Sequence, residues 1–254
     1  MPTTYRADFA GISELEALYF KMSTRLLGSS EKLIDDLLNV VDELKRSSNE
    51  APEAQQKQVP VSLLDVVRYQ FAMAMLACLR GHASTSLVFA RGMAEACGHA
   101  CCLVEDPTLV EMWSEHSRRD KPDKRYREAF KTSRLFPETD ADRNILRARY
   151  AMFSLRTHPS AVVLHAHQTP AEGGFVFDNN DAKRPSDIVE YFVLILDTMV
   201  VCLRCLRSQW GTRLDASCLQ PWDDTFRIVC ERVGRHMVSL KERCDQLKAA
   251  RLRF

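Results

Sequence analysis

The chain of 254 residues has little glycine and proline, with nine of the first and ten of the second. Collagen-like and linker-dominated chains need far more of both, and the many turns of a β-sandwich usually need more as well. Charge of one sign is also lacking, because 35 lysines and arginines nearly balance 34 aspartates and glutamates. No overall field therefore draws the whole protein toward nucleic acid or a membrane surface.

Long uncharged runs are missing too. The most apolar segment, Ile188–Leu206, is interrupted by Glu190, Asp197 and Arg204, whereas a membrane-spanning helix needs about 20 nearly uncharged residues. The first twenty residues hold no apolar stretch long enough for a secretory signal. The nine cysteines are an odd number in a chain large enough to fold without disulfides. We therefore expect a cytoplasmic protein with reduced thiols and no membrane span.

The common cofactor and hydrolase motifs are absent. The sequence contains no GxGxxG, GxxxxGK[ST], HExxH or GxSxG, so nucleotide cradles, zinc-protease sites and hydrolase elbows have no support. No histidine stands three residues after a glutamate, which a ferritin-like di-iron bundle would require. We expect no cofactor.

What the sequence does contain is apolar residues at the helical period of 3.6 along almost its whole length. The predicted fold is all-α, a multi-helix bundle with a long C-terminal helix. We expect an N-terminal helical hairpin at 1–46, a linker at 47–61, and a bundle core at 62–254 with a loop at 168–186. Within that loop, Phe175–Phe177 is predicted to be extended.

Glycine and short polar residues mark several expected helix ends. Gly28 and Gly81 stand where C-cap glycines occur. Ser62 and Asp65 have the spacing of a capping box and predict a helix that begins at Leu63.

Two helices carry patterns that imply a neighbour. The three charges within Ile188–Leu206 are spaced by seven and form one stripe, which we place at a groove, a subunit seam or a solvated edge. The terminal helix, Phe226–Leu252, repeats apolar residues at alternating spacings of three and four. This seam must be buried, either against its own bundle or in a homodimer.

A cluster of cysteines raises the possibility of a metal site. Cys97 and Cys101 share one face of a helix, whereas His99 points about 200° away. Cys202 and Cys205 are the residues that can supply further ligands. Two interpretations of these cysteines stay open: they are inert thiols that pack in the core, or they bind zinc in a zinc-stabilised structural protein.

The segment Arg118–Arg134 is basic, with eight basic and three acidic residues and with Tyr126 and Phe130 interleaved. Phosphate backbones attract such a segment non-specifically. It is either a solvated helix surface or a contact for RNA.

Two rows of polar residues lie at a spacing of four on otherwise apolar helices. The first row is Arg91, Glu95 and His99, and the second is Tyr150, Ser154 and His158. Arg91 and Glu95 can pair at this spacing, and the second row supplies hydroxyl donors and a base that titrates near neutrality. We predict that the rows face each other, as a structural network or as a site.

Three short motifs stand out in the segment 83–167: Leu87–Glu95, Glu105-Asp106-Pro107 with Trp113, and the Tyr150, Ser154, His158, Pro159, Ser160 series. Through these motifs the segment resembles a family of bacterial helical proteins of unknown function. This architecture is similar to HEPN-type bundles, many of which dimerise and some of which cleave RNA without metal. The resemblance implies a HEPN-like core and, for a ribonuclease, His158 as acid/base with Arg91 or Arg156 stabilising phosphate charge. Those ribonucleases place four to six residues between an arginine and a histidine, and this chain has no such pair.

Three functions follow as hypotheses. The favoured one is a non-catalytic intracellular module that binds a protein, RNA or small ligand between the two polar rows, through Glu95, Tyr150, Ser154 and Arg156. The second is a metal-independent ribonuclease of the toxin or defence type, with His158 and Arg91 as catalytic residues. The third is the zinc-stabilised structural protein.

Overall fold

The computed structural model describes residues 9–28, 30–49, 58–116, 124–157, 168–171, 174–177 and 184–250. Its elements are α1 (Phe9–Leu27), α2 (Ser30–Asn49), α3 (Gln58–Leu79), α4 (Ala83–Glu105), α5 (Leu109–His116), α6 (Lys124–Ala129), α7 (Thr132–Leu135), α8 (Ala141–Thr157), β1 (Gln168–Ala171), β2 (Gly174–Phe177), α10 (Pro185–Trp210) and α11 (Ala216–Ala249). The all-α class is confirmed.

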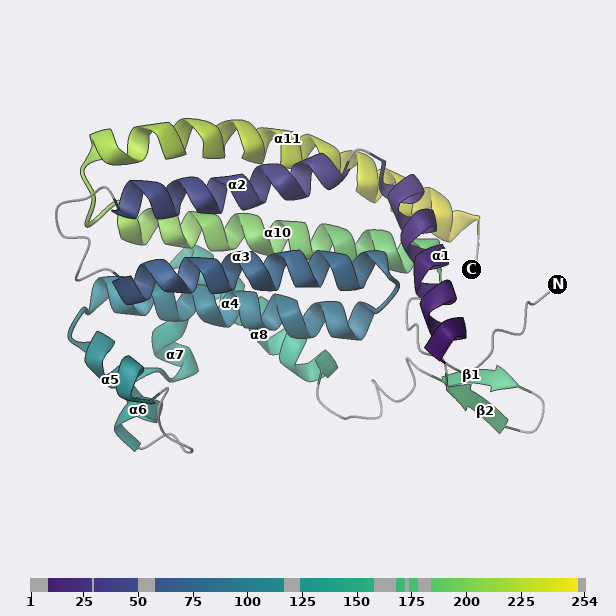
Figure 1. Ribbon diagram of the computed structural model, residues 1–254, viewed down its shortest axis with the longest axis horizontal. Helices are drawn as coiled ribbons and strands as arrows, with labels where there is room; N and C mark the ends of the chain where they lie inside the picture. Colours follow the sequence, from purple (N-terminus) through teal and green to yellow (C-terminus); the bar gives the residue numbers. More distant parts are fainter. Residues whose placement is uncertain are drawn as a thin grey trace.

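The long helices α2, α3, α4, α10 and α11 lie along one axis of a bundle (Figure 1). Helix α4 packs against α3, α8 and α10, and α11 packs against α10 and α2. Apolar residues of all these helices belong to one buried cluster, which includes Leu37, Phe71, Leu87, Phe192 and Val233. The helical period predicted from the sequence thus corresponds to a single shared core.

Helix α2 belongs to this core rather than to a separate N-terminal hairpin. Its residues Leu37, Val40 and Leu44 are fully buried, and the indole of Trp222 on α11 donates a hydrogen bond to the Val40 carbonyl at 2.8 Å. Helix α1 crosses the end of the bundle at a steep angle instead of lying along α2 (Figure 1). Its contacts are with α10, α3 and α2.

The expected linker is shorter than predicted because helices extend into both of its ends. Helix α2 continues to Asn49, and α3 begins at Gln58 with Pro60 in its first turn, where a proline costs no hydrogen bond. The predicted capping box is therefore wrong. The Ser62 hydroxyl donates back to the Gln58 carbonyl at 2.8 Å, and Asp65 accepts from Lys45. Residues 50–57 lie outside the described part of the chain.

The predicted glycine caps are confirmed, since Gly28 and Gly81 have φ values of 62° and 80° that favour glycine. The predicted extended piece is also confirmed within β2. This strand pairs antiparallel with β1, with Gln168 opposite Phe177 and Ala171 opposite Gly174.

Helix α11 begins at Ala216, ten residues before the expected start at Phe226. The apolar seam of this helix faces its own bundle, because Val229, Val233, Leu240 and Cys244 are buried in the shared core. Intrachain packing therefore accounts for the seam that suggested a homodimer, and the dimer stays a prediction.

Within the described residues, α3 and α4 are long and apolar enough to cross a membrane by length and composition. Of their most apolar stretches, 50% and 67% of the residues are buried inside the bundle. Buried core helices meet the same criterion, and both helices contribute to the shared core.

Candidate functional site

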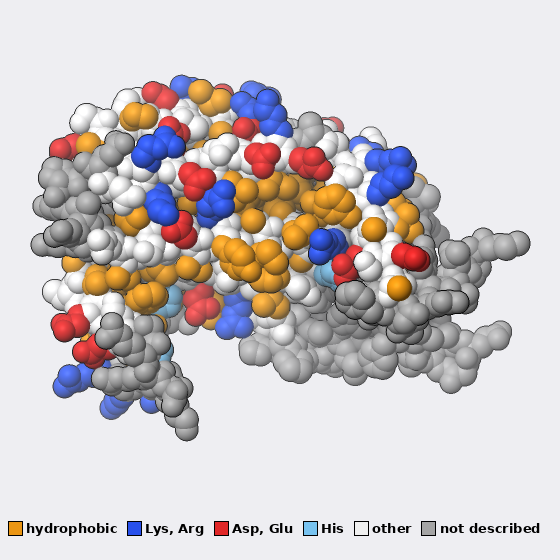
Figure 2. All heavy atoms as spheres, in the orientation of Figure 1, with side chains coloured by type: hydrophobic (Ala, Val, Ile, Leu, Met, Phe, Trp, Pro, Cys, Tyr) orange, Lys and Arg blue, Asp and Glu red, His pale blue; other side chains and the backbone are white. Residues whose placement is uncertain are grey.

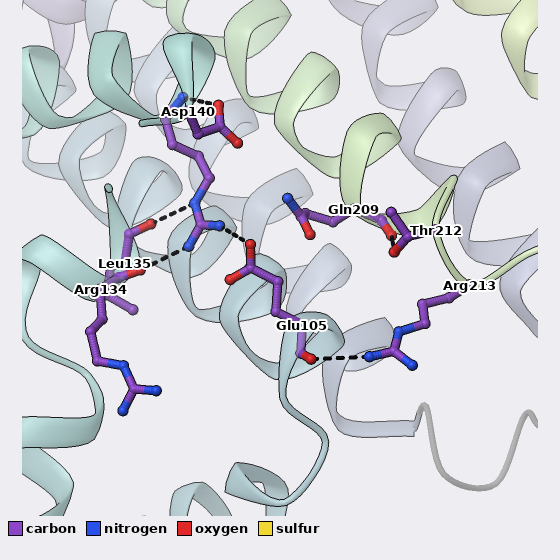
Figure 3. Close-up of polar contacts among 8 residues, drawn as sticks. Glu105, Arg134, Leu135, Asp140, Gln209, Thr212 and Arg213 are labelled. Carbon is purple, nitrogen blue, oxygen red and sulfur yellow. Dashed lines mark hydrogen bonds and ion pairs between the residues drawn. The ribbon is translucent and has the colours of Figure 1, made fainter. Parts of the chain in front are cut away.

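Helix α8, which carries the second polar row, is held in place by a buried arginine at its N-terminal end. The side chain of Arg143 is 1% exposed. Its guanidinium donates to the Leu135 carbonyl at 3.0 Å and to the Arg134 carbonyl at 2.8 Å, and it forms an ion pair with Glu105 at the end of α4 (Figure 3). Its backbone N–H donates to the Asp140 carboxylate at 3.0 Å. This cluster joins α4, α7 and α8.

A close contact between α4 and the segment after α7 also positions the row. A Cβ atom on Gly98 would lie 2.9 Å from the ring of Phe136, so only glycine allows this approach. The Phe136 ring in turn lies 5.5 Å from the Tyr150 ring, between centroids. Backbone packing at Gly98 therefore sets where Tyr150 stands relative to α4.

The two polar rows meet at Arg91 and Tyr150, as predicted. Nη2 of Arg91 donates to the Tyr150 hydroxyl at 3.1 Å, and the guanidinium carbon lies 5.0 Å from the centroid of the Tyr150 ring. A guanidinium at this distance also gains from the ring quadrupole. We call the contact region of these two helices the α4–α8 seam, defined by Arg91, Tyr150 and Ser154.

The predicted pairing of Arg91 with Glu95 is not formed. Arg91 bonds across the helices to Tyr150 instead, because the phenol offers both an acceptor and an aromatic face. The half-buried Glu95 makes no ion pair with any described residue. Its charge acts on Tyr126 of α6, whose pKa is raised by burial and then by Glu95.

The third member of the first row, His99, belongs to a small aromatic cluster. The His99 ring lies 5.0 Å from the Phe130 ring, and Phe130 lies 4.7 Å from Tyr126, between centroids. Tyr126 stacks on His116 at 3.6 Å. Burial, with a smaller effect of the neighbouring His116, lowers the pKa of His99 to about 4. His99 is therefore neutral at pH 7.

His116, Tyr126 and Phe130 are neighbours of the site that the sequence did not identify as such. Tyr126 and Phe130 stand four residues apart in the basic segment, which places both on one side of a helical turn. Figure 2 shows histidine side chains in the angle where α5 and α6 project from the bundle. The spacing alone could not reveal that this projection folds back on α4.

Four buried polar atoms in this region lack a hydrogen-bond partner among the described residues. They are Arg91 Nε, His99 Nδ1, His116 Nδ1 and Ser154 Oγ. The one other such atom in the described part of the chain is Ser23 Oγ. An unpaired buried polar group costs about 1–3 kcal/mol, so their concentration here calls for an explanation.

Two residues predicted for the site are not placed in it. Arg156 is exposed, and its Nη1 donates to the Tyr191 hydroxyl of α10 at 3.1 Å, so it faces α10 rather than the seam. His158 lies outside the described residues. The structure therefore does not test the role of His158 as acid/base, which stays a prediction.

The cysteines converge in the core as packing residues. Cys97, Cys101, Cys202 and Cys205 are fully buried between α4 and α10, and the Cys97 thiol donates to the Cys202 carbonyl at 3.5 Å. Hydrogen bonds with Cys101, Cys202 and Cys205, together with burial, raise the pKa of Cys97. No group of three or more His, Cys, Asp or Glu side chains in the described ranges is arranged to hold a metal ion. The zinc hypothesis gains no support from these residues.

The stripe on α10 lies at a groove, one of the positions expected for it. Glu190 pairs with Lys248 of α11, Asp197 with Arg149 of α8, and Arg204 with Asp142 of α8. A cavity of about 370 Å³ lies along this stripe between α8, α10 and α11. Because its acidic and basic groups are largely paired with one another, the groove offers no excess of either charge.

The basic segment is described only from Lys124 onward. Lys124, Arg125 and Arg127 are exposed on α6, and Lys131 pairs with Glu128. The basic side chains of the described part are thus solvated, whereas Phe130 is buried, and RNA binding stays a prediction.

Comparisons with protein-family models, with curated proteins and with solved structures give no match for this chain. The HEPN-like core is therefore an expectation that these comparisons leave open, and the proposals below stand on the geometry alone.

Proposed function

We propose that this chain is a non-catalytic cytoplasmic helical module that binds a ligand at the α4–α8 seam. The supporting observation is the concentration of unpartnered buried polar atoms on α4, α5 and α8. Native proteins pair nearly all such atoms, and the exceptions gather where a ligand or an ordered water completes the set. Helices held rigidly by Arg143 and Phe136 suit a preformed binding site.

The state of His99 suits this residue to binding rather than to acid–base catalysis. A histidine acts best as a general acid or base when its pKa lies near the working pH. The pKa of about 4 leaves His99 uncharged at neutral pH, and its ring packs against Phe130. The neutral His99 ring can form a hydrogen bond with a ligand, but it is a poor general acid at neutral pH because it carries no proton that it readily transfers.

Replacing Ser154 with alanine tests whether the seam is a binding site or a structural network. The Ser154 hydroxyl has no hydrogen-bond partner among the described residues, so its removal should leave the free energy of unfolding unchanged or raise it by about 1 kcal/mol. Denaturant unfolding measures the change. Ser86→Ala is the matched control, because the Ser86 hydroxyl on α4 is buried and donates to Ala83 at 2.6 Å. This control should lose about 1 kcal/mol. A loss of that size in Ser154→Ala as well would indicate a structural network.

RNA incubated with the purified protein in EDTA should remain intact. This outcome separates the binding module from the metal-independent ribonuclease. Gel analysis of a structured and an unstructured RNA is the measurement. Cleavage that persists in EDTA and is abolished by His158→Ala would overturn the non-catalytic proposal.

A further inference from the structure

The groups along the α4–α8 seam are hydrogen-bond donors. Nε of Arg91 carries a proton and can only donate, and it has no acceptor among the described residues. The Tyr150 oxygen accepts from Nη2 of Arg91, so the proton of the phenol is left to donate elsewhere. Ser154 follows Tyr150 by one helical turn on the same face of α8, and its hydroxyl also has no partner in the part of the chain that the structure describes.

The positive charge at the seam has no counter-ion from the described chain. Arg91 forms no ion pair with any described carboxylate, and its one side-chain hydrogen bond to a described residue goes to the Tyr150 hydroxyl. The nearest acidic residue on α4, Glu95, raises the pKa of Tyr126 on the α6 side. A half-buried guanidinium without a counter-ion, beside unfilled donors, is complementary to a negatively charged acceptor.

We infer that the ligand of the α4–α8 seam is an oxyanion, a carboxylate or phosphate group whose oxygens accept from Arg91, Tyr150 and Ser154. This inference rests on the proposed binding function and names its chemistry. The group belongs either to a small free anion or to a larger molecule. In the second case the rest of the molecule extends toward His99 and the aromatic cluster of α5 and α6, which offers stacking faces.

Anion-dependent thermal unfolding of the full chain tests the inference. Inorganic phosphate and acetate are each compared with chloride at equal ionic strength. Phenyl phosphate and benzoate serve as a second arm, because an aromatic group can reach the stacking faces. We expect a rise in melting temperature that saturates with phosphate or acetate. A stronger effect of the aromatic anions would indicate that the oxyanion group belongs to a larger molecule. An equal effect would indicate that the ligand is a small free anion.

Variants separate binding at the seam from general effects of the salt. Arg91→Met should weaken the anion affinity by about tenfold to a hundredfold, the equivalent of a lost charged hydrogen bond. Tyr150→Phe removes one donor, keeps the ring and should weaken affinity by a smaller factor. Arg156→Met is the matched control, because Arg156 also donates to a tyrosine at 3.1 Å but lies exposed against α10. It should bind the anion as the wild type does.

Each outcome decides for or against the oxyanion. Saturable shifts that Arg91→Met or Tyr150→Phe reduces support it. Equal shifts in every variant reveal only salt effects on stability and overturn it. If no anion shifts the melting temperature while Ser154→Ala keeps its stability, ordered water alone fills the seam or the ligand is of another class, and the oxyanion is excluded. Destabilisation by Ser154→Ala would overturn the binding function itself.

Discussion

Arg143→Met should lower the free energy of unfolding by about 3–5 kcal/mol, the usual result of breaking a buried ion pair from one side. The variant leaves the carbonyls of Arg134 and Leu135 without their donor and Glu105 without its cation. The methionine fills the space of the arginine stem, so that most of the loss comes from these unpaired groups rather than from a cavity. Urea unfolding followed by tryptophan fluorescence measures the change, since Trp210 and Trp222 are both buried.

Arg147→Met, one turn further along α8, provides the control. Arg147 pairs with Glu138, but the two side chains are 38% and 74% exposed. Exposed pairs contribute between zero and about 1 kcal/mol, so this variant should be close to the wild type. Similar losses in the two variants would contradict the clamp that we assign to Arg143.

The stability of the wild type should fall as the pH drops from about 6.5 toward 4 because His99 resists protonation in the folded state. The pKa of His99 is about 4 when folded, against 6.5 for a free histidine. The unfolded chain therefore takes up the proton first. The stabilisation from neutral His99 is complete above pH 6.5 and is lost as the pH falls toward the folded pKa. The shift corresponds to about 3 kcal/mol.

His99→Gln isolates this contribution from the titration of carboxylates. The glutamine variant should show a flatter dependence of unfolding free energy on pH across the same window, while both proteins share any carboxylate contribution below about pH 5. Denaturant titrations at a series of pH values give the two curves. Parallel curves would show that His99 is not held neutral by its burial against Phe130.

The helical character of the chain could be predicted well, whereas the ends of helices could not. The period of apolar residues in α2, such as Leu37, Val41 and Leu44, indicates burial on one face, and these three residues are buried. The capping pattern at Ser62 and Asp65 is a weaker signal. There the tertiary pairing of Asp65 with Lys45 and the tolerance of Pro60 in a first turn allow α3 to begin earlier.

The candidate site could be predicted in part. Side chains four residues apart share one face of a helix. This spacing identified one polar face on α4, which includes Arg91, and one on α8, which includes Tyr150, and these two faces meet. The same rule suggested Glu95 as the partner of Arg91, and it failed because an acceptor on a neighbouring helix competes with one on the same helix. The burial of Arg143 had no signal in the sequence. Its acceptors are backbone carbonyls, which every residue carries and which only the tertiary fold brings together.

The contact between α2 and α11 has a consequence for biosynthesis. Trp222 and Val40 are separated by 182 residues, so α2 leaves the ribosome long before the helix that covers it. At typical elongation rates of 5–20 residues per second, this interval lasts roughly 10–40 seconds. Throughout that time the apolar face formed by Leu37, Val40 and Leu44 lacks its final cover. The nascent chain therefore keeps part of this α2 face exposed, and the face closes only once α11 has been synthesised.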